Sequence, residues 1–327
     1  MIEQPAATIV IITDKHRDRA ERSLGSVLKQ RNVADLEILL VDLSSQDTPP
    51  VPGSEHKNVR VVRMPDALRT TTWGELRANT VRMARAPLVL FLEEHSAGLP
   101  GWAEATIAAL NEEYAGVSGQ VVNDHTRVPN TDAVKICNDA VPLPPNTRRP
   151  TRQLLWGNAA YRRDVLLEFG DALAPLLQNE TMLCERLLQK GHKIGEDGAI
   201  RLVHVREATL GEHGQGIFYL NRSSARLRAS VFNWSPTQKF VAVLGSPFTP
   251  WFRTFKTVRY WQKKDASRVG MVLRNLPRIV MINYYATIGQ ALGLALGEGR
   301  SGNRYLNYAI NVGRPKPDMA RILQEHA

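Results

Sequence analysis

The stretch Ala86–His95 (APLVLFLEEH) determines how the chain is interpreted, together with Gly98–Trp102 (GLPGW) just after it. Leu88 to Leu92 is an apolar run that is too short for a helix and follows a proline, so it predicts a buried strand. Two carboxylates and an imidazole come next. Ligands bind at the carboxyl ends of strands in open α/β sheets, and Glu and His are common ligands of divalent metals. The stretch predicts a ligand site, unless these residues form a solvated strand end.

Strands and helices alternate before this stretch. Apolar, largely β-branched runs predict buried strands at Thr8–Thr13, Leu36–Val41 and Val59–Val62, and helical spacing predicts helices at Ala20–Gln30 and Thr72–Arg85. Such alternation is typical of a doubly wound parallel sheet. The predicted fold class is therefore α/β, with a mostly parallel, Rossmann-like sheet flanked by helices.

Composition limits the class of protein. The 327 residues can form one large α/β domain, or one domain with an appendage. Two cysteines, Cys137 and Cys184, make no disulfide framework, which favours a reducing cytosol. Residues 1–5 show neither a basic segment nor a long apolar one, so we expect no signal peptide.

Six short motifs follow one another between residues 8 and 195. They are Leu24–Gln30 (LGSVLKQ), Val41–Asp47 (VDLSSQD), Arg77–Asn79 (RAN), Glu93–Trp102, Trp156–Arg163 (WGNAAYRR), and Asn179–Leu187 (NETMLCERL) with Gly191–Ile194. In this order they resemble the motifs of family-2-type, inverting glycosyltransferases of the GT-A fold. Each match is short, but six in order are not plausibly chance. The resemblance implies transfer of a sugar from a nucleoside-diphosphate sugar.

The resemblance also implies a metal site. The family's Asp-x-Asp corresponds to Glu93-Glu94-His95, in which Glu93 faces the ribose or a metal-bound water and His95 ligates Mn²⁺ or Mg²⁺. The ion would neutralise the leaving diphosphate as a Lewis acid. His204 is expected to be a further metal or diphosphate ligand; the alternative is an ordinary histidine at a strand end.

Glu180 corresponds to the family's general base, which takes the proton of the acceptor hydroxyl while the acceptor attacks with inversion. Asn179-Glu180 stands where the family has Glu-Asp, so the carboxylate reaches further by one carbon–carbon bond, about 1.5 Å. The alternative is an acidic residue that is favoured at a helix N-terminus only by the macrodipole.

Donor and acceptor contacts are also expected at strand ends. Asp42 would accept the N3–H of a pyrimidine base, unless it closes an Asx turn; Arg77 would reach the diphosphate, unless it is a solvated helix residue. Trp102, as a sugar platform or a packing residue, and Asn158 are placed on the acceptor side, with 123–150 as an acceptor loop. The residues assigned to donor binding are Thr13, Asp14, Asp42, Arg77, Glu93 and Glu94.

The C-terminal third is basic and aromatic. Lys239–Arg278 contains a single acidic residue, Asp265, and Ile279–Gly297 is an uncharged run of about one membrane span. We favour interfacial helices for this run over a transmembrane span or a buried core helix, and the apolar run excludes nucleic acid as the partner. Residues 299–327 are expected to form a surface tail. The predicted domains are 1–228, the glycosyltransferase domain, and 229–327, a membrane-associating helical region.

These features together predict inverting transfer from a nucleoside-diphosphate sugar, with UDP expected, to a lipid-linked or cell-envelope glycan. The protein would be cytoplasmic and peripheral on the inner face of the cell membrane. Two alternatives stay open. One is a non-catalytic GT-A protein that binds sugar nucleotides or assists assembly at the membrane, because both acidic motifs are altered. The other is a soluble transferase that acts on a small molecule.

Overall fold

The computed structural model describes residues 4–122, 133, 136–137, 147–155, 157–204 and 206–315. The chain divides into two compact units. The sheet unit comprises residues 1–124, 142–206 and 315–327, and the helical unit comprises residues 125–141 and 207–314. This division falls earlier in the chain than the boundary predicted at residue 228. Most of the acceptor loop expected over 123–150 lies outside the described residues.

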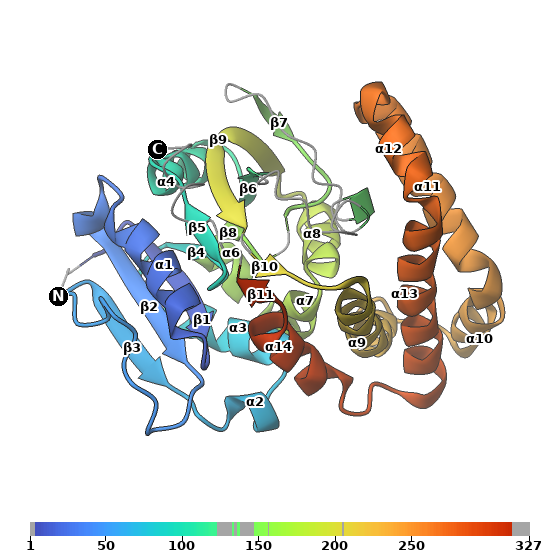
Figure 1. Ribbon diagram of the computed structural model, residues 1–327, viewed down its shortest axis with the longest axis horizontal. Coiled ribbons are helices and arrows are strands. Elements are labelled where there is room, and N and C mark those ends of the chain that lie inside the picture. Colours follow the sequence, from blue (N-terminus) through green and yellow to red (C-terminus); the bar gives the residue numbers. More distant parts are fainter. Residues whose placement is uncertain are drawn as a thin grey trace. The chain divides into compact units, whose positions relative to one another are not determined.

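The sheet unit contains a nine-stranded mixed sheet with the order β3-β2-β1-β4-β8-β6-β9-β5, in which β7 also pairs with β9 (Figure 1). The strands are β1 (Ala7–Thr13), β2 (Leu36–Asp42), β3 (Val59–Arg63), β4 (Leu88–Phe91), β5 (Ser96–Gly98), β6 (Gly116–Val121), β7 (Arg148–Pro150), β8 (Ala159–Arg162) and β9 (Ile194–His204). The strands expected from apolar runs, and the α/β class, are confirmed. The sheet is parallel from β3 to β4, but β8 runs antiparallel to both of its neighbours.

Helices connect these strands. The longer ones are α1 (Arg17–Leu28), α3 (Trp73–Met83), α4 (Trp102–Glu112) and α8 (Glu180–Gln189); the short ones are η1 (Val33–Asp35), α2 (Ala67–Thr70), α6 (Arg163–Leu167), η2 (Gly170–Ala172) and α7 (Leu173–Gln178). A capping box fixes the start of α3: Thr72 Oγ1 accepts the N–H of Glu75, and the Glu75 carboxylate accepts the N–H of Thr72. The first turn of α3 is thereby held in place, one turn before Arg77.

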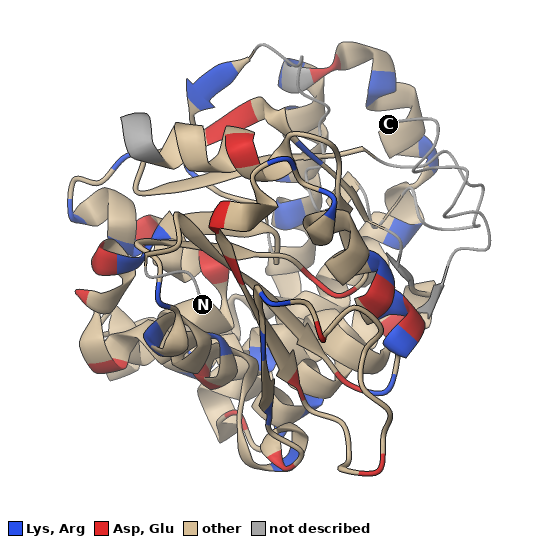
Figure 2. Cartoon of the chain, turned by 90° about the vertical axis from the view of Figure 1, so that its left-hand side faces the viewer, with Lys and Arg blue, Asp and Glu red and all other residues tan. Residues whose placement is uncertain are grey.

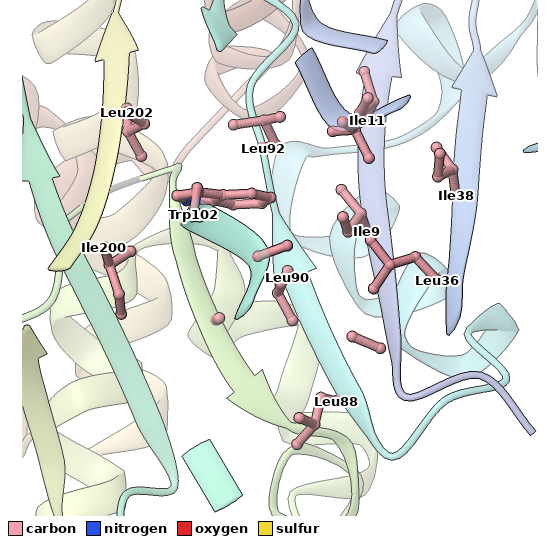
Figure 3. Close-up of a cluster of buried hydrophobic side chains, with 14 of the residues drawn as sticks. Ile9, Ile11, Leu36, Ile38, Leu88, Leu90, Leu92, Trp102, Ile200 and Leu202 are labelled. Atoms are coloured by element: carbon pink, nitrogen blue, oxygen red, sulfur yellow. The ribbon is translucent and has the colours of Figure 1, made fainter. Parts of the chain in front are cut away.

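A hydrophobic core lies between the sheet and the helices that cover one of its faces. Figure 3 shows its members from the strands, together with Leu92 directly after β4: Ile9, Ile11, Leu36, Ile38, Leu88, Leu90, Leu92, Ile200 and Leu202. Trp102 lies among them and is only 2% exposed. A buried indole cannot stack on an acceptor sugar, so the structure supports the packing role of Trp102 and not the acceptor role. The core holds β1, β2 and β4 in place. It thereby also positions the polar residues that directly follow these strands.

The helical unit has one dominant helix pair. Its helices are α9 (Leu210–Val231), α10 (Pro236–Leu244), η3 (Ser246–Phe248), α11 (Thr249–Lys264), η4 (Ala266–Arg268), α12 (Val269–Arg274), α13 (Leu276–Leu296) and α14 (Ser301–Asn311). The short strands β10 (Arg206–Glu207) and β11 (Arg314–Pro315) form a separate two-stranded sheet. The expectation of a surface tail after residue 299 is wrong for α14, because Leu306 and Ile310 are buried.

Among the described residues, α13 is the one helix long and apolar enough to cross a membrane, judged by length and composition alone. It packs closely on α9: a Cβ on Gly289 would lie 2.4 Å from the carbonyl oxygen of Phe218. Ile279, Ile282 and Ala286 are buried as well. Within the helical unit, the inner face of α13 is therefore packed as in a core helix, which was one of the alternatives to an interfacial helix.

Gly289→Ala tests this packing. The added methyl has no room against the α9 backbone, so we expect unfolding in urea, followed by circular dichroism, to show a loss of about 1–3 kcal/mol. Gly270→Ala in α12 is the matched control, because its Cβ would meet nothing within 4 Å. The control should leave stability unchanged or raise it by about 0.5–1 kcal/mol. Equal effects of the two variants would contradict close α9–α13 packing.

Candidate functional site

Three potential metal ligands converge just beyond the end of β4. Nε2 of His95 lies 3.1 Å from Nε2 of His204, and Oε2 of Glu93 lies 3.3 Å and 3.5 Å from these two nitrogens, respectively. Strand pairing brings them together, because β5 runs antiparallel to β9 with Ser96 opposite His204. The predicted ligands His95 and His204 are therefore adjacent, although 109 positions separate them in the sequence.

The three atoms fit one divalent ion. Ligand atoms about 2.0–2.2 Å from a metal lie about 3.0–3.5 Å apart in octahedral or tetrahedral geometry, and the observed separations fall in this range. A carboxylate with two imidazoles is a set that divalent transition metals accept. The two nitrogens are also within hydrogen-bond distance of each other, and the tautomers decide which of them donates.

Electrostatics keep the carboxylate of this group ionised. Burial raises the pKa of Glu93, but the charges and hydrogen bonds of His95 and His204 outweigh burial and hold the pKa well below its ordinary value. Glu93 is therefore an anion at neutral pH, which is the form that binds metal.

Glu94 and Thr13 lie behind the group. Glu94 is 2% exposed, with Oε1 3.5 Å from Nη1 of the buried Arg19 and Oε2 3.4 Å from the Thr13 hydroxyl. Its Oε1 is also 3.7 Å from Nδ1 of His95. This separation is longer than a hydrogen bond, so Glu94 lies near the ring of His95 without fixing it, and Thr13 contacts Glu94. Both residues, expected to bind the donor, lie next to the group of Glu93, His95 and His204.

Asn158 lies beside Glu93. Its Nδ2 donates to Glu93 Oε2 (3.1 Å), and its Oδ1 accepts the backbone N–H of Glu93 (3.2 Å). Gly157, the residue before it, has a φ of +74°, and a Cβ there would lie 2.3 Å from Oε1 of Glu93. The Gly157 N–H donates to Oε2 of Glu180 (2.9 Å). One two-residue segment thus contacts both the Glu93 carboxylate and the Glu180 carboxylate, which is expected to act as base.

Glu180 begins α8 and forms a buried ion pair with Arg77 of α3. The two residues are 2% and 1% exposed, so the alternative of a solvated arginine is wrong. The guanidinium carbon of Arg77 lies 3.9 Å from the centre of the Phe91 ring, at the end of β4. Arg77, expected to reach the diphosphate, is therefore the partner of Glu180 in this structure.

Asp42 ends β2 and is buried next to the end of β1, where Thr13 is its register partner and Asp14 follows. Its Oδ1 accepts the N–H of Ser44 (3.0 Å), which is the Asx turn weighed as the alternative. Nη2 of Arg17, at the start of α1, lies 3.0 Å from Asp42 Oδ2. Arg17 and Arg19 were not predicted as site residues, because arginines among other polar residues at a helix start carry no sequence pattern that marks a site.

Comparison with known proteins decides the class. Residues 8–168 match the model of glycosyl transferase family 2. This domain belongs to that family, and the protein is a glycosyltransferase. The crystal structure of S. aureus TarS 1-349 is similar with a TM-score of 0.44 and 16% identity, covering 89% of this chain and 91% of that one. A structure described as a mycobacterial protein has the same score and identity, covering 69% and 74%. No curated protein gives a significant match.

Arg77→Met tests the buried pair. Removing the guanidinium leaves the Glu180 charge buried without its partner, so we expect a loss of about 3–5 kcal/mol in the free energy of unfolding. Adding Glu180→Gln should recover part of that loss. Arg162→Met is the control, because its pair with Asp164 is exposed and contributes little. A loss in Arg77→Met no larger than in Arg162→Met would show that the pair does not form.

Proposed function

We propose that the protein transfers a sugar, with inversion, from a UDP-sugar to a hydroxyl of a lipid-linked or cell-envelope glycan. The supporting observation is the group of Glu93, His95 and His204 beyond β4, joined through Gly157 to the buried carboxylate of Glu180. It lies in a chain whose family is that of sugar-transferring enzymes.

A divalent ion is proposed as the cofactor, held by Glu93, His95 and His204. When bound, it would neutralise the charge of the departing diphosphate. One carboxylate and two neutral imidazoles leave a net charge of +1 on a divalent site, which favours an anionic ligand. Imidazole nitrogens suit Mn²⁺ better than Mg²⁺, which prefers oxygen ligands. Mn²⁺ is therefore the better candidate.

Glu180 is proposed as the general base. Its two oxygens accept from Arg77 and from the Gly157 N–H, and these contacts fix the direction of the carboxylate. Each carboxylate oxygen has a second lone pair that can accept a proton from an acceptor hydroxyl. Arg77 and Gly157 then act by positioning the base.

The nucleotide is proposed to lie at the ends of β1 and β2, near Asp14 and Asp42. Asp42 would accept the N3–H of a pyrimidine base. For this, one oxygen of its carboxylate must release Arg17 and accept the base instead. Arg17 would then be free to pair with a phosphate. The acceptor side and the linkage depend on the loops around residues 123–150.

The location is proposed to be cytoplasmic, peripheral on the inner face of the membrane. The apolar helix α13 and the basic C-terminal sequence support it. A second candidate is a sugar-nucleotide-binding protein without transferase activity. It is favoured by the burial of Glu180 and by the occupation of Asp42 by Arg17 and Ser44.

Titration calorimetry tests the metal site. We expect UDP to bind more tightly than GDP or dTDP, at least tenfold better with Mn²⁺ than without it, and we expect His95→Ala to abolish the Mn²⁺ effect because one of three ligands is lost. His192→Ala, whose side chain pairs with Glu168 elsewhere in the sheet unit, is the control and should bind as wild type. Binding that is independent of Mn²⁺ in wild type would remove the metal from the proposal.

Glu180→Gln tests the base. The amide keeps the shape but cannot take a proton, so we expect kcat to fall by about 10²–10⁴-fold with UDP binding unchanged. Glu185→Gln on the same helix is the control and should keep its kcat. Full activity in Glu180→Gln would exclude the base role. Metal-dependent UDP binding without turnover or donor hydrolysis in wild type would favour the non-catalytic candidate.

A further inference from the structure

Exposed apolar side chains are concentrated in one part of the chain. Among the described residues, thirteen large hydrophobic side chains are exposed, and all but Val61 belong to α10–α13 and the residues between them. Soluble proteins rarely leave contiguous apolar surface of this kind without a partner. The helical unit therefore presents a surface that needs an occupant.

Seven of these side chains follow one another along α10, η3 and the first half of α11. Their exposed fractions range from 58% to 75%. We define them as the aromatic patch: Phe240, Val241, Leu244, Phe248, Trp251, Phe252 and Phe255. The inner face of α11 is anchored separately, because Trp261 is buried and its Nε1–H donates to the carbonyl oxygen of Ile136. The aromatic patch is thus the outer face of a fixed helix pair.

The patch continues onto α13, which lies beside α11 in Figure 1. The rings of Trp251 and Tyr284 meet edge to face, with centroids 6.5 Å apart. Met281, three residues before Tyr284, and Ile288, four residues after it, are also exposed. The face of α13 that carries Gly289 packs on α9, and the exposed side chains lie on a different face of the helix. A helix with one face held in this way can touch a bilayer without crossing it.

Positive charge surrounds the aromatic patch. Residues 207–314 carry 15 of the 42 Lys and Arg residues but only four of the 32 Asp and Glu residues, a net charge of +11 against +10 for the whole chain. The sheet unit differs, since Figure 2 shows acidic and basic residues interspersed over it. On α11 the exposed face changes from Trp251, Phe252 and Phe255 to Lys256 and Arg259. Apolar side chains bordered by lysine and arginine are typical of helices that lie in an anionic interface.

Arg253 adds a specific feature beside the aromatic patch. It lies between Phe252 and Thr254 on α11, and its guanidinium donates to Oε1 of Gln290 (2.7 Å). Within the described chain its charge meets no carboxylate at ion-pair distance, and burial lowers its pKa. An uncompensated, half-buried guanidinium favours an anionic group from outside, such as a phosphate.

We propose that the aromatic patch inserts into the surface of an anionic lipid leaflet, with Arg253 and the basic residues of α11 contacting lipid phosphates. This rests on the proposed function, which places the enzyme at a membrane, and it assigns the contact to α10–α11 instead of a span by α13. A second copy of the chain is a poorer occupant, because two surfaces of high positive charge repel each other.

Vesicle flotation tests the proposal with the full-length protein. Vesicles of phosphatidylcholine alone are compared with vesicles that also contain phosphatidylglycerol. We expect wild type to float with the anionic vesicles only. Trp251→Ser/Phe252→Ser/Phe255→Ser should reduce the bound fraction at least tenfold, and so should Lys256→Glu/Arg259→Glu. Val61→Ser is the control for the loss of exposed apolar surface, and Lys57→Glu is the control for the reversal of charge. Both variants should bind vesicles as wild type does.

The depth to which the aromatic patch inserts into the bilayer is measured with the same vesicles. Brominated lipids should quench tryptophan fluorescence in wild type, and Trp251→Phe, which keeps an aromatic ring, should float normally but lose most of the quenching. Donor hydrolysis without vesicles, measured on each variant, separates this surface from the catalytic site: unchanged hydrolysis with lost flotation supports the proposal. Flotation unaffected by the triple variant overturns it, as does a wild type that dimerises through the aromatic patch and ignores vesicles. Absent hydrolysis in wild type that still floats would count against the proposed function alone.

Discussion

The pairing of β5 with β9 is the constraint on which the site depends. β5 has three residues, yet it places Ser96 opposite His204 and so brings His95 against a histidine from the other end of the sheet unit. Glu93 arrives from the other direction, at the end of β4, whose position the core fixes through Leu88 and Leu90. The proposed metal site cannot form before β5 pairs with β9. Metal affinity would therefore report on the register of this strand pair.

The second constraint is the Gly157-Asn158 segment, which contacts both carboxylates of the site. Asn158 holds Glu93 from the side, and the Gly157 N–H holds Glu180. A side chain at position 157 would occupy the space of the Glu93 carboxylate, and the positive φ already disfavours one. In the proposed reaction, the diphosphate leaves the donor sugar in the same step in which the acceptor hydroxyl loses its proton. Attaching both carboxylates to one short, rigid segment is a simple way to fix their separation.

Local sequence patterns predicted the strands that carry the site but not all the contacts within it. β1, β2 and β4 are apolar runs buried on both faces, so their ends, and the polar residues beyond them, were predictable. β5 and β7 are three residues long and carry no periodicity. The pairing of His95 with His204 was anticipated only through the resemblance to a family. The Arg77–Glu180 pair joins residues 103 apart, and no local pattern marks Arg77 as buried. Trp102 is the opposite case: it was assigned to the acceptor side because tryptophan often binds sugars, but its side chain fills the core.

Anomalous diffraction at the manganese edge, from crystals grown with UDP and Mn²⁺, would locate the proposed ion directly. We expect one strong peak within bonding distance of Oε2 of Glu93 and Nε2 of both His95 and His204. A peak elsewhere, or UDP bound with the two histidines hydrogen-bonded to each other and no manganese, would contradict the proposed metal site.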